Sequence, residues 1–417
     1  MSSPLVSVIV PFYRAKQHLD NIVRVLQKQT LREMEFLLVD DCSGDGSYEY
    51  AREITNHDAR FVILQTPQRS GPGCARNSGI ENARGEYIGC IDVDDSISDE
   101  YYERLYKKSL STGALVVKGR CVRILPGEKK EESTLNLSIK RALDAKKHLL
   151  NVFHYEHCTC IYNRSFVNGI QARYGECAQG EDAIFQMKIM CNLPPEKLAL
   201  EEGAIYFYNR TSPTSLYNNL NKEFLKHSVD SLRLRLEYLA KQPDAEHVHN
   251  YVRGQFEEKI ITRTKRVWDS FLITRADILD YLDAIMCIAK SWVESHQSNY
   301  YGSYLRMAEK TNFSASRLLE LIADEMRRTE CRDEITKALQ SLTSGTSYAG
   351  NADLERKLML LANADAVICL YHKAKWRAFF SFGKKKHANK VRVEKLRAQV
   401  REIREIRRRF IEESVEF

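Results

Sequence analysis

Short apolar runs rich in β-branched residues alternate with helical patterns through the first ninety residues. The runs are four to five residues long and end at turn residues, which predicts buried strands at 6–10, 35–39, 61–64 and 87–91. Apolar positions at helical spacing predict a helix at 20–28, and we also expect helices at 48–56 and 75–83. We expect the first strand to stop at Pro11, which has no N–H to donate to a strand ladder. Strands that alternate with helices predict an α/β fold with a mostly parallel sheet.

Polar and special residues collect where the predicted strands end. In a parallel sheet these carboxyl ends share one edge, and ligands bind in the crevice beyond it. The residues at these ends are Pro11–Tyr13, Asp40–Asp41, Thr66–Pro67 and Asp92–Asp95. Neither the dinucleotide nor the Walker glycine pattern follows the first three strands. A nucleotide diphosphate at this edge would therefore need a cation in place of a backbone cradle.

The segment Asp92-Val93-Asp94-Asp95 places three carboxylates within four residues at the end of an apolar strand. Such a concentration of negative charge is costly unless a positive charge lies beside it. Mg²⁺ commonly bridges protein carboxylates and substrate phosphates, so the segment is a candidate metal site. The alternative is a solvated acidic turn in which Ser96 and Asp99 cap the next helix.

The bulk composition is that of an ordinary globular protein. The chain has 417 residues, of which 43% are hydrophobic and 29% charged, and its length suits two or three domains. The first residues show no basic, apolar leader, and no apolar run is long enough to span a bilayer. Eleven cysteines without framework spacing predict reduced thiols and a cytoplasmic location.

Six sequence blocks follow one another in a characteristic order. They are Val-Ser-Val-Ile-Val-Pro-Phe-Tyr (6–13), Leu-Gln-Lys-Gln-Thr (26–30), Leu-Val-Asp-Asp-Cys-Ser-Gly-Asp-Gly-Ser (38–47), Gly-Cys-Ala-Arg-Asn-Ser-Gly-Ile (73–80), the run from 83 to 95, and Gly-Glu-Asp-Ala-Ile-Phe (180–185). In order and spacing they resemble the GT-A domain of family 2 glycosyltransferases of the bacterial surface-glycan type. The resemblance covers residues 4–215. It implies a Rossmann-like nucleotide-sugar domain with a central, mostly parallel sheet, and an inverting reaction.

The resemblance assigns the nucleobase pocket to residues that follow the first two predicted strands. Pro11, Phe12 and Tyr13 would line this pocket. Asp41, or Asp40 beside it, would accept a hydrogen bond from a base N–H. These assignments come from the family and not from the spacing of the residues.

Further along the chain, the resemblance implies that Arg76 lies beside the base or the diphosphate and that Asp92 holds the ribose. Asp94, with Asp95, would hold Mn²⁺ or Mg²⁺ against both phosphates. Arg210, in an aromatic segment similar to the family's closing segment, would reach the diphosphate after a loop closes. A solvated helix position for Arg76 and an edge strand around Arg210 are the open alternatives.

The catalytic base implied by the resemblance is Asp182, and Glu181 would orient the acceptor or Asp182 itself. An acceptor hydroxyl has a pKa far above neutral, so a carboxylate must take its proton in the transition state. The alternative is that the two acids compensate the dipole of a helix that begins there. His154 and His157 are acceptor-side candidates, because cysteines next to them stand where the family often has a Trp and a Lys.

Helical patterns dominate the chain after residue 215, where the resemblance ends. One apolar stripe with spacings of three and four residues consists of Leu225, Val229, Leu232, Leu236 and Leu239. We therefore expect a nucleotide-sugar domain at 1–215, an α-helical domain at 216–372 and a basic amphipathic helical tail at 373–417.

The tail concentrates the positive charge of the chain. Residues 373–409 contain fifteen Lys or Arg and three Glu, a net charge of +12, which leaves −5 of the total +7 for the rest. Aromatic residues lie among these cations, and this combination favours an anionic membrane surface. A near-heptad apolar stripe leaves a homodimeric coiled coil, or packing on the body, as alternatives. Nucleic acid is not expected, because no recognised binding module accompanies the charge.

These features together predict an inverting, metal-dependent glycosyltransferase. It would move a sugar from a nucleotide-sugar donor, preferably a UDP-sugar, to a hydroxyl of a glycan or glycolipid acceptor in lipopolysaccharide, capsule or exopolysaccharide, at the inner face of the cytoplasmic membrane. One alternative is a sugar-nucleotide nucleotidyltransferase, although residues 11–16 are not the glycine-rich basic loop it would need. A non-catalytic membrane-associated scaffold with a degenerate GT-A fold is the other alternative.

Overall fold

The computed structural model describes most of the first three hundred residues. The described residues are 3–295 except 146, 153–155, 177–179, 212–219, 244 and 268–271, together with 314–316, 318–319 and 322. Contacts divide the chain into two units, one made of 1–259 and 266–288 and the other of 260–265 and 289–417. The expected basic tail and His154 lie outside the described residues, and the expected domain limits at 215 and 372 stay predictions.

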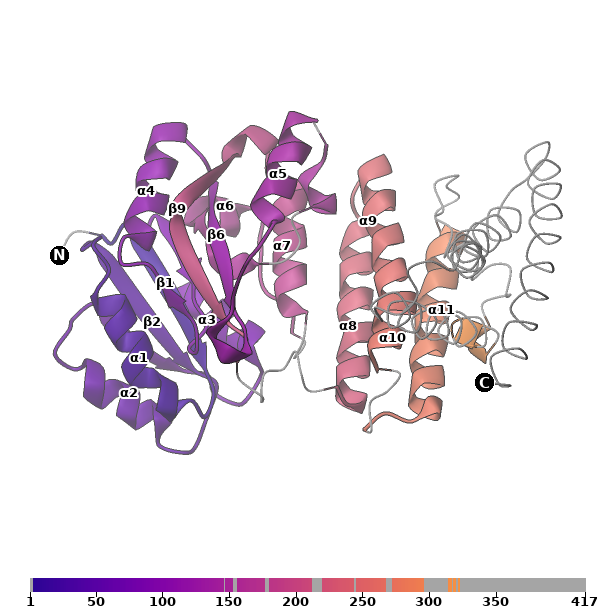
Figure 1. The fold of residues 1–417 in the computed structure, drawn as a ribbon, viewed down its shortest axis with the longest axis horizontal. Helices are drawn as coiled ribbons and strands as arrows, with labels where there is room; N and C mark the ends of the chain where they lie inside the picture. Colours follow the sequence, from indigo (N-terminus) through magenta and orange to yellow (C-terminus); the bar gives the residue numbers. More distant parts are fainter. Residues whose placement is uncertain are drawn as a thin grey trace, which may run out of the picture. The chain divides into compact units, whose positions relative to one another are not determined.

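One mixed sheet runs through the first unit (Figure 1). Its strands in the described part of the chain are β1 (Val6–Phe12), β2 (Met34–Asp40), β3 (Phe61–Gln65), β4 (Tyr87–Cys90), β5 (Ser96–Ile97), β6 (Val116–Ile124), β7 (Lys130–Glu132), β8 (Cys160–Asn163) and β9 (Leu198–Asn209). Their order is β3-β2-β1-β4-β8-β6-β9-β5, with β7 paired to β6. The first four strands of this order are parallel, and β8 pairs antiparallel with both β4 and β6. The expected α/β fold with a mostly parallel core is confirmed.

Helices cover the sheet and continue after it. Those that the structure describes are α1 (Lys16–Gln27), α2 (Ser47–Thr55), α3 (Pro72–Asn82), α4 (Tyr101–Thr112), α5 (Leu135–Asp144), α6 (Arg164–Gly169), α7 (Glu181–Asn192), α8 (Lys222–Leu239), α9 (Glu246–Glu257), α10 (Thr264–Val267) and α11 (Arg275–Ser295). α3 packs on β1 and β2, and α4 packs on β6 and β9 (Figure 1). α8 contacts both α7 and α9. Within the described segments, no helix has the length and apolarity needed to span a bilayer.

The end of β1 differs from the expectation, because the strand continues through Pro11 to Phe12. β1 pairs with β4 only as far as Ile9, opposite Cys90. On the other side, Pro11 lies opposite Val39 of β2. Proline is tolerated here because the neighbouring strand β4 has already ended, so this part of β1 has no ladder on that side. The extension carries Phe12, which is buried, to the edge of the sheet where ligands are expected to bind.

Helix α3 lies so close to β1 that a single methyl group should destabilise the fold. A Cβ atom added at Gly79 would come within 2.4 Å of Ile9 Cγ2, and Ile9 is fully buried. We expect Gly79→Ala to lower the free energy of unfolding by about 1–3 kcal/mol through overpacking. Gly254→Ala is the matched control, because that helical glycine has no atom within 4 Å of its added Cβ. In the control, helix propensity should raise the free energy of unfolding by up to about 1 kcal/mol. Equal urea midpoints for the two variants would contradict the close packing of α3 on β1.

Candidate active site

The buried Asp40 closes the end of β2. Its carboxylate accepts hydrogen bonds from Ser43 N at 3.0 Å, from Ser43 Oγ, and from Gln65 Nε2 at 2.8 Å. These contacts hold the loop after β2 against the end of β3. Asp40 was expected to contact a nucleobase, and its position at the sheet edge is compatible with that role, which stays a prediction.

Asp41 organises the loop between β3 and α3. Its carboxylate accepts hydrogen bonds from Thr66 Oγ1 at 3.1 Å, Ser70 N at 2.9 Å and Gly71 N at 2.8 Å. Gly71 has a φ of +90° at the start of α3, a conformation that favours glycine. The carboxylate therefore fixes the entry of the chain into α3, and its expected contact with a base N–H is untested.

Tyr13, the residue after β1, has two cations close to its ring. The guanidinium carbon of Arg69 is 4.3 Å from the centre of the Tyr13 ring, and that of Arg14 is 5.2 Å away. Arg14 itself has a φ of +47° and donates from its backbone N to Ser43 Oγ at 2.8 Å. The sheet edge therefore presents an aromatic ring and two guanidinium groups, a combination that suits an anionic, aromatic ligand.

Arg76 joins two segments that are far apart in the sequence. Its guanidinium donates to Asp92 Oδ1 at 2.7 Å and to Glu181 Oε1 at 2.8 Å, and the residue is only 4% exposed. Burial lowers the pKa of Arg76, but the two carboxylates outweigh burial and raise this pKa well above its ordinary value. The solvated position left open for Arg76 is therefore wrong. This arginine ties the end of β4 to the first turn of α7.

Residue 73 shows how closely α3 approaches α7. A Cβ atom added at Gly73 would lie 2.5 Å from the backbone oxygen of Gly175 and 3.0 Å from Glu181 Cβ. Only glycine therefore allows the two helices to come this close without a shift of the backbone. The contact brings Glu181 within reach of Arg76.

Asp182 lies next to Glu181 at the start of α7 and faces His157. The Oδ2 atom of Asp182 is 3.7 Å from His157 Nδ1, and its Oδ1 atom accepts a hydrogen bond from Ala183 N at 2.8 Å. His157 begins a short 3₁₀ turn, His157–Thr159, that leads into β8. On the other side of the imidazole, Cys158 Sγ lies 3.0 Å from His157 Nε2 and 3.8 Å from Asp92 Oδ1.

The two neighbouring acids of α7 have pKa values on opposite sides of the ordinary range. Burial, and then the charge of Asp182, raise the pKa of Glu181 to about 7. Burial also acts against ionisation of Asp182, but the neighbouring His157, and then Arg76, outweigh it and lower the pKa of Asp182 to about 2. Environments that separate two carboxyl pKa values in this way are typical of paired catalytic acids and bases.

The three acids after β4 have different surroundings. Burial raises the pKa of Asp92, but Arg76 and then His157 overcome this effect and lower it. Burial and the neighbouring charge of Asp92 raise the pKa of Asp94. The Asp94 carboxylate has no hydrogen-bond or ion-pair partner among the residues that the structure describes. In the described part of the chain, the acidic segment therefore leaves one partly buried carboxylate without an ion pair, and the more distant charge of His18 offsets only part of the rise in its pKa.

Asp95 is a buried anchor between β4 and β9. It accepts hydrogen bonds from the Tyr206 hydroxyl and, at 2.7 Å, from Asn209 N. Burial, and then Asp92, raise its pKa well above the ordinary value. No set of three or more His, Cys, Asp or Glu side chains in the described part of the chain is grouped closely enough to hold a metal. The metal role expected for Asp94 and Asp95 stays a prediction.

Arg210 follows the last residue of β9. Its backbone N donates to Ile124 O at 2.8 Å, and its guanidinium carbon lies 5.5 Å from the centre of the Tyr208 ring. The strand itself lies between β6 and β5, so β9 is not an edge strand as the alternative supposed. The expected contact of Arg210 with a diphosphate is untested.

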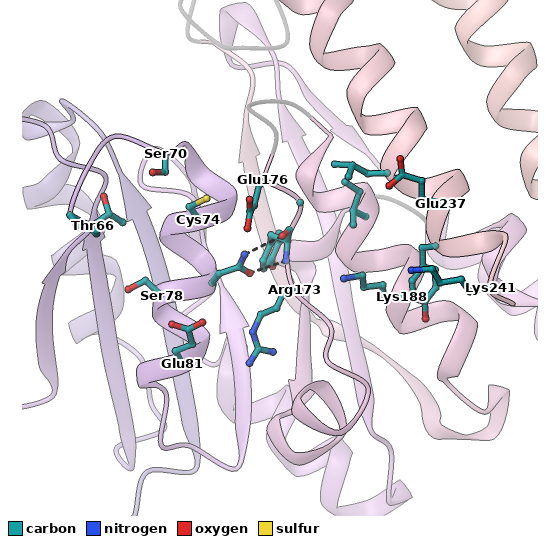
Figure 2. A pocket seen from close by; sticks show the side chains of 17 residues that line it. Thr66, Ser70, Cys74, Ser78, Glu81, Arg173, Glu176, Lys188, Glu237 and Lys241 are labelled. Atoms are coloured by element: carbon teal, nitrogen blue, oxygen red, sulfur yellow. Dashed lines mark hydrogen bonds between the residues drawn. The ribbon is translucent and has the colours of Figure 1, made fainter. Parts of the chain in front are cut away.

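A pocket of about 730 Å³ lies beside this cluster, between α3, α7, α8 and the loop before α7 (Figure 2). Its charged lining is balanced between Arg173, Lys188 and Lys241 and the acids Glu81, Glu176 and Glu237. Tyr174 separates the pocket from the cluster. The Tyr174 backbone exchanges two hydrogen bonds with Asn77, drawn dashed in Figure 2, and its ring lies 5.3 Å from both Arg76 and His157. No sequence signal singled out Tyr174, because one tyrosine in a loop has no motif.

Comparison with known proteins identifies the N-terminal region. Residues 7–170 match the model of the family described as Glycosyl transferase family 2. An uncharacterized glycosyltransferase of Haemophilus influenzae is 38% identical over 104 residues, which are 25% of this chain and 42% of the relative. The glycosyltransferase GlyG of Streptococcus pneumoniae is 38% identical over 117 residues, 28% of this chain and 39% of the relative. The chain thus spans about two fifths of the length of these curated relatives.

Solved structures match over a longer stretch. Residues 1–349 of Staphylococcus aureus TarS superpose with a TM-score of 0.52 and 18% identity, and the match covers 74% of this chain and 91% of that one. The same protein in complex with UDP-GlcNAc superposes with a TM-score of 0.53 and 16% identity, covering 74% and 92%. At this identity the likeness shows the fold alone. Together with the family match, it shows that the N-terminal part of this chain is a GT-A domain that belongs to glycosyltransferase family 2.

Proposed function

We propose that this chain is an inverting glycosyltransferase that moves a sugar from a UDP-sugar to a hydroxyl of a bacterial surface glycan. One observation carries the proposal: Arg76 joins Asp92, after β4, to Glu181, beside Asp182. Asp92, the candidate donor-binding residue, and Asp182, the candidate general base, therefore belong to one cluster. TarS has been solved with UDP and with UDP-GlcNAc, and a relative from Rhizobium meliloti is named for succinoglycan biosynthesis, which supports the donor and the acceptor class.

On the donor side, the nucleobase would lie at the ends of β1 and β2. Pro11 and Phe12 are buried at this edge, and Tyr13 is half-buried beside Arg69. Asp41 fixes the neighbouring loop and retains lone pairs for a base N–H. Asp92, which Arg76 keeps ionised, would accept from a ribose hydroxyl.

The acidic segment fits a divalent cation. The pKa of Asp94 is raised by burial and by Asp92, which means that an added positive charge there would be favourable. Asp94 would be the principal ligand of Mn²⁺ or Mg²⁺, and Asp95, bonded to Tyr206 and Asn209, would hold the segment in place. When bound, the ion supplies positive charge for the departing diphosphate.

We expect Asp94→Asn, or chelation by EDTA, to abolish donor turnover. The amide removes the charge that would bind the cation, so the loss should be at least about a hundredfold at millimolar Mn²⁺. Nucleoside-diphosphate release measures the effect. Asp99→Asn is the control, because that exposed acid lies in the same segment. Full activity of Asp94→Asn in EDTA would remove the metal from the proposal.

On the acceptor side, Asp182 would be the general base. Its carboxylate is ionised at neutral pH, since its pKa is about 2, and its side chain is 33% exposed. It would take the proton of the acceptor hydroxyl as that oxygen bonds to the sugar C1 and the C1–diphosphate bond breaks. A single displacement of this kind inverts the configuration at C1. Glu181, held by Arg76, would support the geometry without contacting C1.

The test of the function is a panel of nucleotide sugars assayed for metal-dependent release of nucleoside diphosphate. We expect UDP-sugars to react, with release raised by a glycan acceptor. Absence of release from every donor, with no UDP binding by calorimetry in the presence of Mn²⁺, would favour the scaffold alternative.

Membrane attachment through residues 373–417 belongs to the same proposal. Fifteen Lys or Arg among aromatic residues should bind vesicles that contain anionic lipid, by about 1 kcal/mol per cation near the surface. Flotation of the full chain with such vesicles should be lost after truncation at residue 372. Unchanged flotation after this truncation would reject the role of the tail, and a change of oligomeric state instead would indicate self-association.

A further inference from the structure

The His157 side chain lies deeper in the protein than the Asp182 side chain that it contacts. The His157 side chain is 8% exposed, whereas the Asp182 side chain is 33% exposed. An acceptor that approaches from the open side therefore meets the carboxylate before the imidazole. The acceptor contact expected for His157 from the sequence stays a prediction, and the burial of the imidazole favours a different role.

Both ring nitrogens of His157 have partners. Nε2 is 3.0 Å from Cys158 Sγ, and Nδ1 is 3.7 Å from Asp182 Oδ2. Burial, and then Asp92, raise the pKa of the Cys158 thiol well above its ordinary value, so the sulfur carries its proton at neutral pH. The thiol has two acceptors within reach, Nε2 at 3.0 Å and Asp92 Oδ1 at 3.8 Å, and we assign its proton to the nearer one, Nε2. A neutral imidazole that accepts at Nε2 donates at Nδ1, toward Asp182.

The backbone before His157 is held in an unusual conformation. Glu156 has a φ of +65°, which is uncommon for a residue other than glycine and is kept only where surrounding contacts enforce it. Its carboxylate pairs with the fully buried Lys118 at 3.1 Å and with Arg123 at 3.3 Å, and it accepts from the Ser133 hydroxyl. These contacts fix the start of the 3₁₀ turn that carries His157.

The ring of His157 is also confined. The Tyr174 ring meets it edge-on with centroids 5.3 Å apart, and Tyr174 in turn stacks on Phe185 at 4.4 Å. The Tyr162 hydroxyl donates to the backbone oxygen of His157 at 2.9 Å. The imidazole therefore has little freedom to turn away from Asp182.

The negative charges around Asp182 explain why its contact with His157 matters. Asp92, Glu181 and Asp182 lie in one cluster, and Arg76 forms ion pairs with the first two only. The negative charge of Asp182 raises the pKa of both Asp92 and Glu181, so ionisation of the three acids is mutually unfavourable. His157, with Arg76, thus supports the ionised form of the third acid.

We propose that His157 is a positioning residue that holds Asp182 as the general base, and that Cys158 fixes the tautomer of His157 by donating its thiol proton to Nε2. The proposal rests on the proposed glycosyl transfer. Each oxygen of Asp182 keeps a lone pair for the acceptor hydroxyl. The acceptor proton moves to Asp182 during transfer, while His157 keeps its own Nδ1 proton and its orientation.

The experiment compares His157→Ala with His157→Asn, in a transfer assay with the donor that the panel identifies and an octyl glycoside as acceptor. Loss of the Nδ1 donor should lower kcat about tenfold to a hundredfold, while the acceptor KM stays within about twofold, as for partners that orient a reacting group. Asn places an N–H near the position of Nδ1, so His157→Asn should recover most of kcat. His227→Ala, on α8, is the control.

The pH profile separates positioning from general loss of structure. The titratable and charged groups around Asp182 are His157, Cys158, Arg76, Glu181, Asp92 and, from α9, Tyr251. Loss of the contact with His157 raises the pKa of Asp182, so the acid limb of kcat/KM should move to higher pH in His157→Ala. In His157→Asn, which keeps a hydrogen-bond donor, the shift should be smaller.

Long-range ¹H–¹⁵N spectra of the histidine rings test the tautomer without any substrate. The signal that disappears in His157→Asn belongs to His157 and should show the Nδ1–H form. Cys158→Ala should disturb that signal, and Cys158→Ser, which keeps a donor, should preserve it. An Nε2–H tautomer, or a His157→Ala enzyme with wild-type kcat and acid limb, would overturn the positioning role. A rise in acceptor KM alone would return His157 to acceptor contact. An inactive wild-type enzyme would remove the proposed function instead, and this inference with it.

Discussion

Asp182→Asn should lose at least about a thousandfold in transfer rate, because general base catalysis contributes roughly 10²–10⁴ and the amide cannot take a proton at neutral pH. Donor binding should be unchanged, since Asp182 is assigned to the acceptor side. The Asp182 carboxylate is ionised at neutral pH and part of its side chain is exposed, so it is ready to act without a prior proton transfer. Calorimetry of UDP binding with Mn²⁺ and a transfer assay on the same preparation measure the two effects separately.

The control for this variant is Asp280→Asn, an exposed acid on α11 that contacts no part of the cluster. Its kcat and donor affinity should equal those of the wild type. An Asp182→Asn enzyme with wild-type turnover would exclude Asp182 as the base. An equal loss of donor binding and turnover would instead place Asp182 on the donor side.

Arg76→Met should have the largest effect on stability. It removes the cation shared by two buried or half-buried carboxylates, and breaking a buried ion pair costs about 3–5 kcal/mol. Donor turnover should be lost as well, because Asp92 and Glu181 would no longer be held together. Urea unfolding monitored by circular dichroism measures the free energy of unfolding.

The pH dependence of the Arg76→Met defect follows from the sign of the pKa changes. Without Arg76, the folded-state pKa values of Asp92 and Glu181 rise, and the folded protein then binds protons more tightly than the unfolded chain. Stability falls as pH rises under that condition. The deficit relative to the wild type should therefore be larger at pH 8 than at pH 5.

Two further variants control the Arg76 prediction. Arg104→Met removes an ion pair with Glu100 in which the side chains are 45% and 52% exposed, so the cost should be no more than about 1 kcal/mol. Adding Glu181→Gln to Arg76→Met should recover part of the stability, because one uncompensated charge disappears. Equal stability of the Arg76 and Arg104 variants would contradict the buried bridge.

Hydrophobic periodicity was sufficient to predict the parallel core, because each early strand is a short apolar run and the first helix between strands, α1, has one apolar face. The core strands begin and end within about two residues of the expected limits. The exception is β1, since the effect of Pro11 depends on where the neighbouring strand β4 ends, and this pairing is not visible in the sequence. The mixed half of the sheet depends on long-range pairing of β6, β8 and β9, for which no local pattern exists.

The site was only partly predictable for a related reason. The sequence blocks pointed to Asp92 and Asp182, and the structure brings both into contact with one Arg76–His157 cluster. Nothing in the sequence indicated that Asp95 would accept a hydrogen bond from Tyr206, because the two residues are 111 positions apart. The same holds for Arg76 and Glu181, which are 105 positions apart. Partners of this kind are set by the fold, and a motif names only one member of each pair.

The most direct test of the account is the anomeric configuration of the sugar product that the enzyme forms first. Proton NMR spectra recorded in the first minutes of reaction with an α-linked UDP-sugar, before the anomers interconvert, distinguish the two outcomes. A single displacement, with diphosphate leaving on the Asp94 side and Asp182 activating the incoming oxygen, predicts the β product. Formation of the α product would contradict one-base inversion at this site.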